Sequence, residues 1–181
     1  MSWQPPRESQ FHAPTERCPH PEWWSAWNAV STEVEASMLV AALVKATQPE
    51  FILEVGSHYG QTSERIGHVV IENGHGEFIS LDNNPEMIGS ASHRCQGLPV
   101  YFICADSLKY IPARPIDFLF IDGDEQRSKD LLHFMPYLAP SCVVVVHDTA
   151  YYLIETGIIL KEWHWDHIEL PTPRGLMVLT R

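Results

Sequence analysis

The sequence predicts an α/β protein built on a doubly wound, mostly parallel sheet of seven strands. From Phe51 onward, five short apolar runs alternate with amphipathic stretches of helical length, a pattern typical of buried parallel strands covered by helices. Two further strand-like runs, at residues 165–170 and 176–180, are separated by a turn that contains prolines and a glycine. This ending predicts a C-terminal antiparallel hairpin.

Length, hydropathy and charge restrict the class of protein. The chain has 181 residues, enough for one domain, and its 45% hydrophobic content allows a substantial core. A formal net charge of -11 repels nucleic acid and anionic membranes. The longest apolar runs are far shorter than the roughly 20 residues that cross a bilayer, and the polar N-terminus lacks the apolar stretch of a secretory signal. We expect a cytoplasmic protein with no nucleic acid or membrane partner.

The cysteines do not suggest a stabilising framework. Four are scattered along the chain, at Cys18, Cys95, Cys104 and Cys142, and no two have CxxC spacing. Cys104 and Cys142 also lie beside hydrophobic runs that read as strands. We therefore predict reduced thiols rather than disulfides or a zinc site.

The N-terminal region predicts an arm or lid followed by a helix. Five prolines within residues 1–22 forbid regular structure over most of that stretch. A helix is expected next, with Ser31 or Thr32 as its N-cap and Pro49 as its stop. We therefore divide the chain into an arm at residues 1–30 and a main domain at residues 31–181.

The remaining elements follow from the apolar runs and from the helical periodicity between them. The expected parallel strands are residues 51–55, 77–81, 100–104, 118–121 and 143–146. The helices between them are expected at residues 62–72, 85–95 and 126–138. The connection at residues 107–115 is short and carries two prolines, so a reduced link is expected there.

The loop after the first strand has the character of a ligand-binding turn. Gly56 and Gly60 allow the backbone to approach a ligand closely, and the helix that follows offers unpaired N–H groups. A dinucleotide fingerprint would need glycine in place of His58 and Gln61. A phosphate-binding loop would need a lysine directly after Gly60, and none is present. Nicotinamide and nucleoside triphosphate binding are therefore disfavoured.

Acidic residues stand at the ends of the successive strands. Asp82, Asp106, Asp122 and Asp148 each follow an apolar run. One such acid alone would be read as a helix or turn cap. In open α/β sheets, however, ligands bind at the carboxyl ends of the strands. The set as a whole therefore predicts a ligand site at that edge.

Taken in order, the loop and the acids resemble the motifs of class I S-adenosylmethionine-dependent methyltransferases, which have a Rossmann-like fold. The resemblance extends over about residues 31–181. It implies that Asp82 holds the ribose hydroxyls, for which a carboxylate is well suited because it accepts two hydrogen bonds at once. It also implies that Asp106 accepts from the adenine amine. The full set implied to bind the cofactor is Glu54, Gly56, Ser57, His58, Tyr59, Gly60, Thr62, Ser63, Asp82, Asn83, Asp106, Ser107 and Asp122.

The nearest subgroup by resemblance contains metal-dependent small-molecule O-methyltransferases, such as those acting on catechols and macrolide sugars, and cephalosporin-biosynthesis relatives. It implies a divalent metal, magnesium or manganese, held by Asp122, His147 and Asp148. His147 departs from the subgroup, which has an acid or asparagine there. Magnesium prefers oxygen ligands, whereas histidine favours transition metals. The alternative is that Asp122 and Asp148 organise loops or face the cofactor's charge.

Catalysis in this family rests mainly on alignment, because the sulfonium is already an activated methyl donor. A base would assist by accepting the proton of an acceptor hydroxyl. The catechol enzymes place a lysine where this chain has Glu125. His147, whose ordinary pKa is near neutrality, is therefore the expected base if it is not a metal ligand. Asp122 is the second expected catalytic residue.

The resemblance predicts an S-adenosylmethionine-dependent methyltransferase that modifies a hydroxyl of a small molecule. The alternatives are a non-catalytic binding module on the same fold and a metal-dependent enzyme of different chemistry. A homodimer is compatible with the small size of the chain. The tryptophans predict either an aromatic acceptor pocket or, as we favour, anchors of helices or a subunit interface. Four precede the first strand, and Trp163 and Trp165 precede the hairpin.

Overall fold

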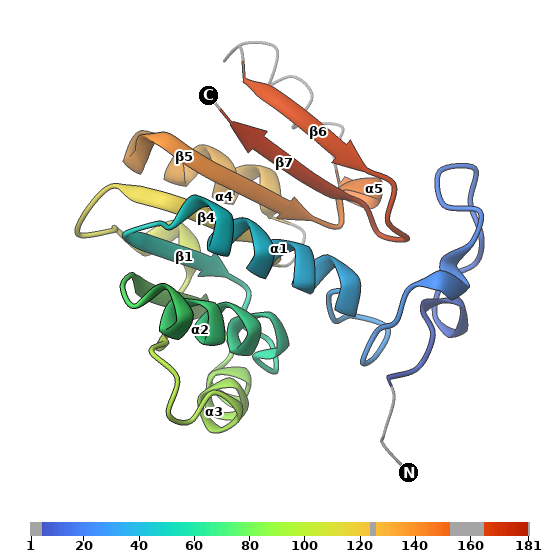
Figure 1. Ribbon diagram of the computed structural model, residues 1–181, viewed down its shortest axis with the longest axis horizontal. Coiled ribbons are helices and arrows are strands. Elements are labelled where there is room, and N and C mark those ends of the chain that lie inside the picture. Colours follow the sequence, from blue (N-terminus) through green and yellow to red (C-terminus); the bar gives the residue numbers. More distant parts are fainter. Residues whose placement is uncertain (1–4, 124–125, 153–164, 181) are drawn as a thin grey trace.

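A single seven-stranded sheet organises the molecule. The computed structural model describes residues 5–123, 126–152 and 165–180, and its strand order is β3-β2-β1-β4-β5-β7-β6 (Figure 1). Strands β1 to β5 are parallel, and β7 lies antiparallel between β5 and β6. The strands are β1 (Phe51–Val55), β2 (Glu77–Asp82), β3 (Tyr101–Cys104), β4 (Ile116–Ile121), β5 (Leu138–His147), β6 (Asp166–Leu170) and β7 (Leu176–Thr180). The predicted fold class is confirmed.

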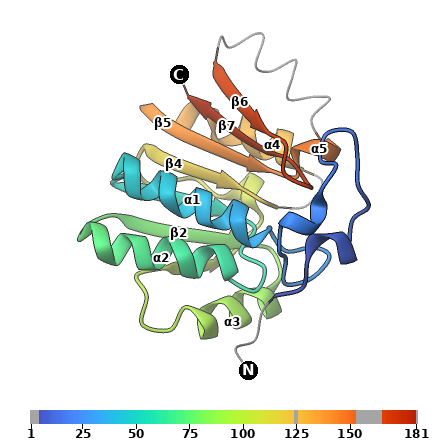
Figure 2. The same ribbon diagram turned by 45° about the vertical axis from the view of Figure 1, so that its right-hand side comes forward.

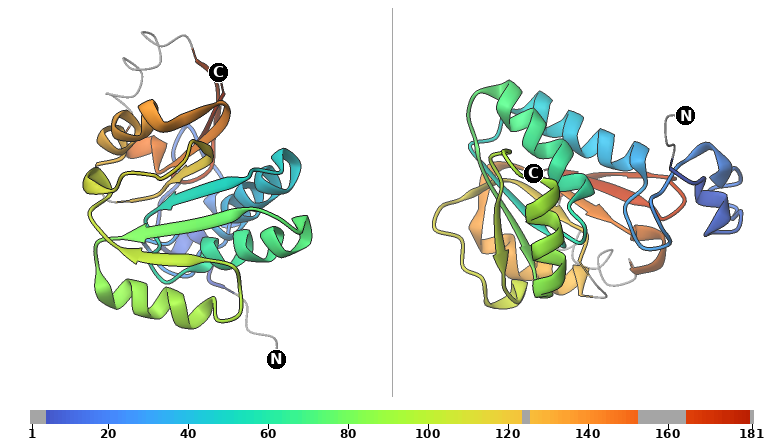
Figure 3. Two further views of the ribbon diagram at one scale, coloured as in Figure 1. Left: turned by 90° about the vertical axis from the view of Figure 1, so that its left-hand side faces the viewer. Right: turned by 90° about the horizontal axis from the view of Figure 1, so that it is seen from below.

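Helices cover both faces of the sheet, as Figure 3 shows in its left view. Helices α1 (Val34–Thr47) and α2 (Gln61–Asn73) pack side by side on one face (Figure 2). Helix α4 (Arg127–Phe134) lies on the opposite face, α3 (Pro85–Arg94) lies against β2 and β3, and the short α5 (Thr149–Tyr152) follows β5. The described residues also form the 3-10 turns η1 (Glu8–Gln10), η2 (Pro21–Trp23), η3 (Ser107–Lys109) and η4 (Met135–Tyr137).

The alternation of β1 side chains explains how one strand serves two cores. Ile52 is fully buried in the cluster that contains α1 and α2. Phe51, Leu53 and Val55 belong to the opposite cluster, together with α4 residues such as Phe134. Because successive strand residues point to opposite faces, a continuous apolar run is needed wherever both faces are covered. The sheet is therefore held by a core on each face, and its parallel strands end together at one edge.

Several predicted boundaries differ from the structure, and three of them have a visible cause. Helix α1 begins at Val34, because the hydroxyl of Ser31 instead accepts the N–H groups of Trp27 and Asn28. The predicted helix at residues 126–138 ends at Phe134 and continues as η4, which contains a proline. Strand β5 then starts at Leu138, earlier than predicted, because its first residue also pairs with β4.

The N-terminal arm lies at the edge where the parallel strands end, close to the loop between β6 and β7 (Figures 1 and 2, blue). It folds back on itself, because the N–H of Glu8 donates to the carbonyl of Trp24. The Glu8 side chain is completely buried and pairs with Arg174 of the β6–β7 loop at 3.0 Å. The arm is therefore packed against the domain, while its role as a lid stays a prediction.

The described tryptophans agree with the anchoring interpretation. Trp165 is buried in the core, and the Arg94 guanidinium lies 5.5 Å from the ring centre of Trp27. Trp23 is 65% exposed and stacks on His20. None of the tryptophans within the described ranges lines the cleft discussed below. Trp3 and Trp163, like Glu125, lie outside the described residues.

All four cysteines lie outside any disulfide; Cys18, Cys95 and Cys142 are buried, and Cys104 is exposed. Within the parts of the chain that the structure describes, none of the helices has both the length and the apolar character that crossing a membrane requires.

Candidate functional site

A cleft of about 970 Å³ opens at the carboxyl ends of the parallel strands. It is bordered by the loops that follow β1, β2, β3, β4 and β5, and by the segment that precedes α1. This is the edge at which a doubly wound sheet binds its ligands. The predicted cofactor residues that line it are Gly56, Ser57, His58, Thr62, Asp82, Asn83, Asp106, Ser107 and Asp122.

The first loop is held close to the neighbouring strands by its glycines. Gly56 has a φ of +95°, and a side chain there would place its Cβ 2.3 Å from the backbone oxygen of Asp122. The N–H groups of Gly56 and Ser57 donate to the carbonyl of Leu81 at 2.8 and 3.1 Å. Only glycine satisfies both the left-handed φ and the close approach. The loop is thereby fixed across the ends of β1, β2 and β4.

Asp82 lies at the end of β2 and faces this loop. Its two carboxylate oxygens accept the backbone N–H groups of His58 and Asn84, each at 2.9 Å. A carboxylate has about four acceptor positions, so two remain for hydroxyl donors from a ligand in the cleft. This arrangement fits the ribose role implied by the resemblance.

Asp106 is placed more loosely at the end of β3. Its carboxylate accepts the N–H of Leu108 at 3.1 Å and pairs with Lys109 at the same distance. The Lys109 hydrogen bond, followed by the Leu108 backbone bond, lowers the pKa of Asp106. The neighbouring Ser107 donates to Asp130 at 2.6 Å. Asp106 thus caps η3 and also borders the cleft, so its adenine role stays a prediction.

Four predicted cofactor residues do not line the cleft: Glu54, Tyr59, Gly60 and Ser63. Glu54 is buried behind the loop, where it accepts the hydroxyl of Ser80 at 2.5 Å and that of Ser63. Burial raises the pKa of Glu54 to about 8. Its hydrogen bonds with Ser63 and Ser80 connect β1 to α2 and β2 inside the protein. Direct contact between Glu54 and a ligand is therefore not favoured by its position.

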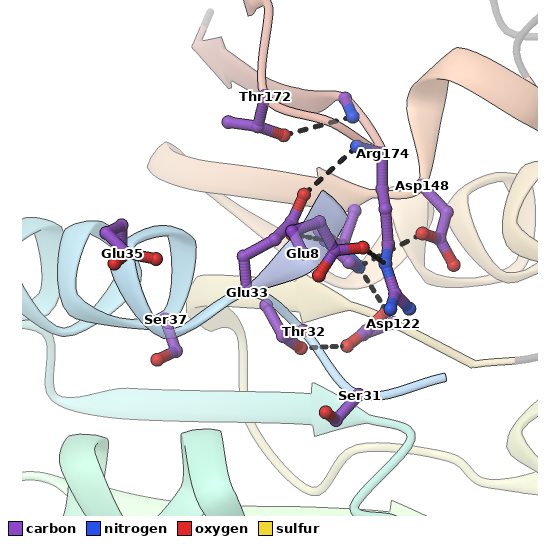
Figure 4. Close-up of polar contacts among 12 residues, drawn as sticks. Glu8, Ser31, Thr32, Glu33, Glu35, Ser37, Asp122, Asp148, Thr172 and Arg174 are labelled. Carbon is purple, nitrogen blue, oxygen red and sulfur yellow. Dashed lines mark hydrogen bonds and ion pairs between the residues drawn. The ribbon is translucent and has the colours of Figure 1, made fainter. Parts of the chain in front are cut away.

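The three residues predicted to hold a metal do come together at the ends of β4 and β5. The ligand atoms of Asp122, His147 and Asp148 all lie within 4.8 Å of one another. Asp148 has a φ of +60°, a conformation that side-chain-bearing residues adopt mainly where the surroundings impose it. Figure 4 shows both aspartates beside residues from the segment before α1 and from the β6–β7 loop.

His147 is enclosed by carboxylates on both sides of its ring. Its Nε2 lies 2.5 Å from Glu33, and its Nδ1 lies 2.8 Å from Asp122. Burial alone would lower the pKa of His147, but the charges of Asp122 and Glu33 hold it well above its usual value. For Asp122, burial alone would raise the pKa, whereas the His147 charge lowers it to about 2. Both ring nitrogens of His147 are thus in hydrogen-bond contact with carboxylates, an environment that favours the protonated ring.

This placement disfavours both predicted roles of His147. Both of its ring nitrogens are already engaged by carboxylates, and the side chain does not line the cleft where an acceptor or a metal would have to be reached. Nη2 of Arg127 lies 2.5 Å from Asp148 and 3.5 Å from Asp122. Each of the three predicted metal ligands therefore already has a charged partner within the protein. Asp122 remains at the cleft as a charged residue that orients its neighbours.

Sequence reasoning missed several members of this network. Thr32 donates to Asp122, and the Arg174 backbone N–H donates to Glu33 at 3.0 Å (Figure 4). The Arg174 side chain also holds Glu8 and the carbonyl of Asn28. Glu33 gives no local sign of a distant partner, because an acid at the start of a helix is already accounted for by the favourable charge at the helix end.

A profile of the family described as a methyltransferase domain matches residues 53–149, which is more than half of the chain. The chain belongs to this methyltransferase family. The predicted membership of the class I S-adenosylmethionine-dependent methyltransferases is confirmed. Among curated proteins, none matches the sequence significantly.

Solved structures share the fold of this methyltransferase at low sequence identity. The O-methyltransferase from Bacillus cereus in complex with S-adenosylhomocysteine has 15% identity and a TM-score of 0.69, with 84% of this chain and 83% of that chain covered. A methyltransferase from Geobacter sulfurreducens has 16% identity and a TM-score of 0.71, covering 85% and 83%. The O-methyltransferase involved in tomaymycin synthesis in Streptomyces achromogenes, in complex with S-adenosylmethionine, has 16% identity and a TM-score of 0.66, covering 96% and 92%.

Proposed function

We propose that this methyltransferase binds S-adenosylmethionine in the cleft and transfers its methyl group to a hydroxyl oxygen of a small molecule. The observation that carries the cofactor assignment is the placement of Asp82 against the Gly56 loop, with acceptor capacity left on its carboxylate. Similar solved structures whose names specify O-methyltransferases support the choice of oxygen. When bound, the cofactor supplies an activated methyl group.

Residues at one end of the cleft would bind the cofactor, and residues at the other end would face the acceptor. Asp82 would orient the ribose, and the Gly56 loop would bring the backbone close to the amino acid part of the cofactor. Asp106 and Ser107 would border the adenine. Asp148 would face the acceptor, since it lines the cleft and Arg127 holds its carboxylate in place there.

The experiment that tests this function uses cofactor labelled in its methyl group and a panel of small acceptors. Each hydroxyl compound is paired with its amine analogue, and products are identified by mass spectrometry. We expect label in methyl ethers or esters of some hydroxyl compounds. Label found only in amine products would overturn the choice of oxygen, and failure of the protein to bind the cofactor would overturn the function.

A further inference from the structure

The site between β4 and β5 already contains a fixed cation. Arg127 begins α4 and is only 6% exposed. Its Nη2 atom lies 2.5 Å from Oδ2 of Asp148 and 3.5 Å from Oδ1 of Asp122. Arg127 lines the cleft together with both aspartates. The guanidinium thus stands between the two carboxylates that a metal would have to bridge.

The remaining ligand atoms are also engaged by protein groups. On Asp122, Oδ1 meets Nδ1 of His147 at 2.8 Å, and Oδ2 accepts the hydroxyl of Thr32. On His147, Nε2 meets Glu33 at 2.5 Å. On Asp148, Oδ1 lies 3.4 Å from Nδ1 of His147. A cation that bound these three residues would have to displace Arg127 and break the His147 contacts.

We propose that the Arg127 guanidinium occupies the place predicted for a divalent metal between Asp122 and Asp148, so that the acceptor end of the cleft works with a fixed organic cation. Arginine suits this position because its charge is permanent and its planar fork pairs with carboxylates in a defined geometry. Neutralising two buried carboxylates also removes the electrostatic reason for taking up a dication. The inference rests on the proposed function only in naming this end of the cleft as the acceptor side.

Manganese binding tests the proposal without needing an acceptor, because electron paramagnetic resonance measures the fraction of Mn²⁺ that remains unbound. For the wild-type protein we expect no saturable binding up to about 1 mM Mn²⁺. Arg127→Gln should raise the affinity for Mn²⁺ roughly tenfold or more, a range typical of changes next to metal ligands. Arg127→Lys keeps the charge and should behave like the wild type.

Matched variants identify the site of any binding. Arg114→Gln removes an arginine that pairs with Glu50 and Glu77 at the opposite end of the sheet, and it should not alter Mn²⁺ affinity. The gain in Arg127→Gln should disappear when Asp148→Asn is added. An unchanged Mn²⁺ affinity in folded Arg127→Gln would overturn the proposal.

The wild-type measurement decides the question even if Arg127→Gln does not fold. Saturable Mn²⁺ binding below about 100 μM in the wild type, lost in Asp148→Asn, would show that the site takes a metal and would overturn the proposal. Titration of the same samples with S-adenosylhomocysteine separates the two claims. If S-adenosylhomocysteine does not bind, the proposed function fails, whereas the Mn²⁺ result still reports on Arg127.

Discussion

Oε2 of Glu33 lies 2.5 Å from Nε2 of His147, and both side chains are almost completely buried. Glu33 immediately precedes α1, whereas His147 ends β5. The contact therefore joins the chain before the first helix to the carboxyl end of β5, next to Asp148, which lines the cleft. It also keeps His147 in the donor form that holds Asp122 in position.

Glu33→Gln should destabilise the protein by about 2 kcal/mol, because it removes the charge-assisted hydrogen bond at Nε2 of His147 while Asp122 still pairs with Nδ1. Urea denaturation provides the measurement. Glu72→Gln is the matched control, since Glu72 is 63% exposed and pairs with Lys45 at 3.4 Å. That variant should change stability by less than about 0.5 kcal/mol. Equal effects of the two substitutions would contradict the importance of the buried pair.

The buried carboxyl of Glu54 should give stability a distinctive pH dependence. Its pKa is about 8 in the folded protein against 4.5 as the reference value. The folded state therefore holds a proton that the unfolded state has lost between these values, so this group's contribution to stability is present at low pH and falls as pH rises towards 8. The total loss is about 5 kcal/mol.

Glu54→Gln removes this titration while retaining an oxygen that accepts from Ser63 and Ser80. Between pH 5 and pH 8, roughly the window of the shift, the wild type should lose stability relative to the variant. Denaturation curves across this range measure the difference. Parallel pH profiles for the two proteins would show that Glu54 does not carry the raised pKa.

Gly56→Ala should destabilise the fold by about 2 kcal/mol or more and abolish binding of S-adenosylhomocysteine, because the new Cβ meets the Asp122 backbone in a left-handed conformation. Gly89→Ala is the matched control, since a Cβ there has open space in α3. The control should stabilise the helix by about 0.5 to 1 kcal/mol. Normal cofactor binding by Gly56→Ala would contradict the assigned loop geometry.

The pair formed by Glu8 and Arg174 should hold the arm against the domain. A double-mutant cycle with Glu8→Gln and Arg174→Met should give a coupling energy of about 2 kcal/mol, because both side chains are buried. The exposed pair Lys45 and Glu72 offers a control cycle with coupling below about 0.5 kcal/mol. A near-zero value for Glu8 and Arg174 would mean that the arm is held by other contacts.

The sequence predicted the parts of the site that depend on local order. Gly56 and Asp82 were found because each follows a strand directly, and parallel strands bring their ends to one edge. The network around His147 could not be found in this way. Glu33 and His147 are 114 residues apart, and Glu8 and Arg174 are 166 apart. The local hydrophobic pattern does not predict which charged residues, far apart in the sequence, will form ion pairs in the folded protein.

The same limit explains the boundary errors and the disfavoured roles of His147. Thr32 has the chemistry of a helix cap, but its hydroxyl donates to Asp122 across the fold. His147 has a suitable reference pKa for a base, yet two carboxylates from distant segments keep it charged. The residue type indicated which hydrogen bonds and protonation states are available to each side chain, whereas its neighbours in the folded protein determine which of them it adopts.

Calorimetric titration with S-adenosylhomocysteine tests the cofactor site most directly. The wild type should bind, and Asp82→Asn should bind roughly 10- to 100-fold more weakly, because hydrogen bonds to a charged acceptor are lost. Asp166→Asn, an exposed change on β6, should bind like the wild type. Absence of binding by the wild type, or unchanged affinity in Asp82→Asn, would contradict the assignment of this cleft to S-adenosylmethionine.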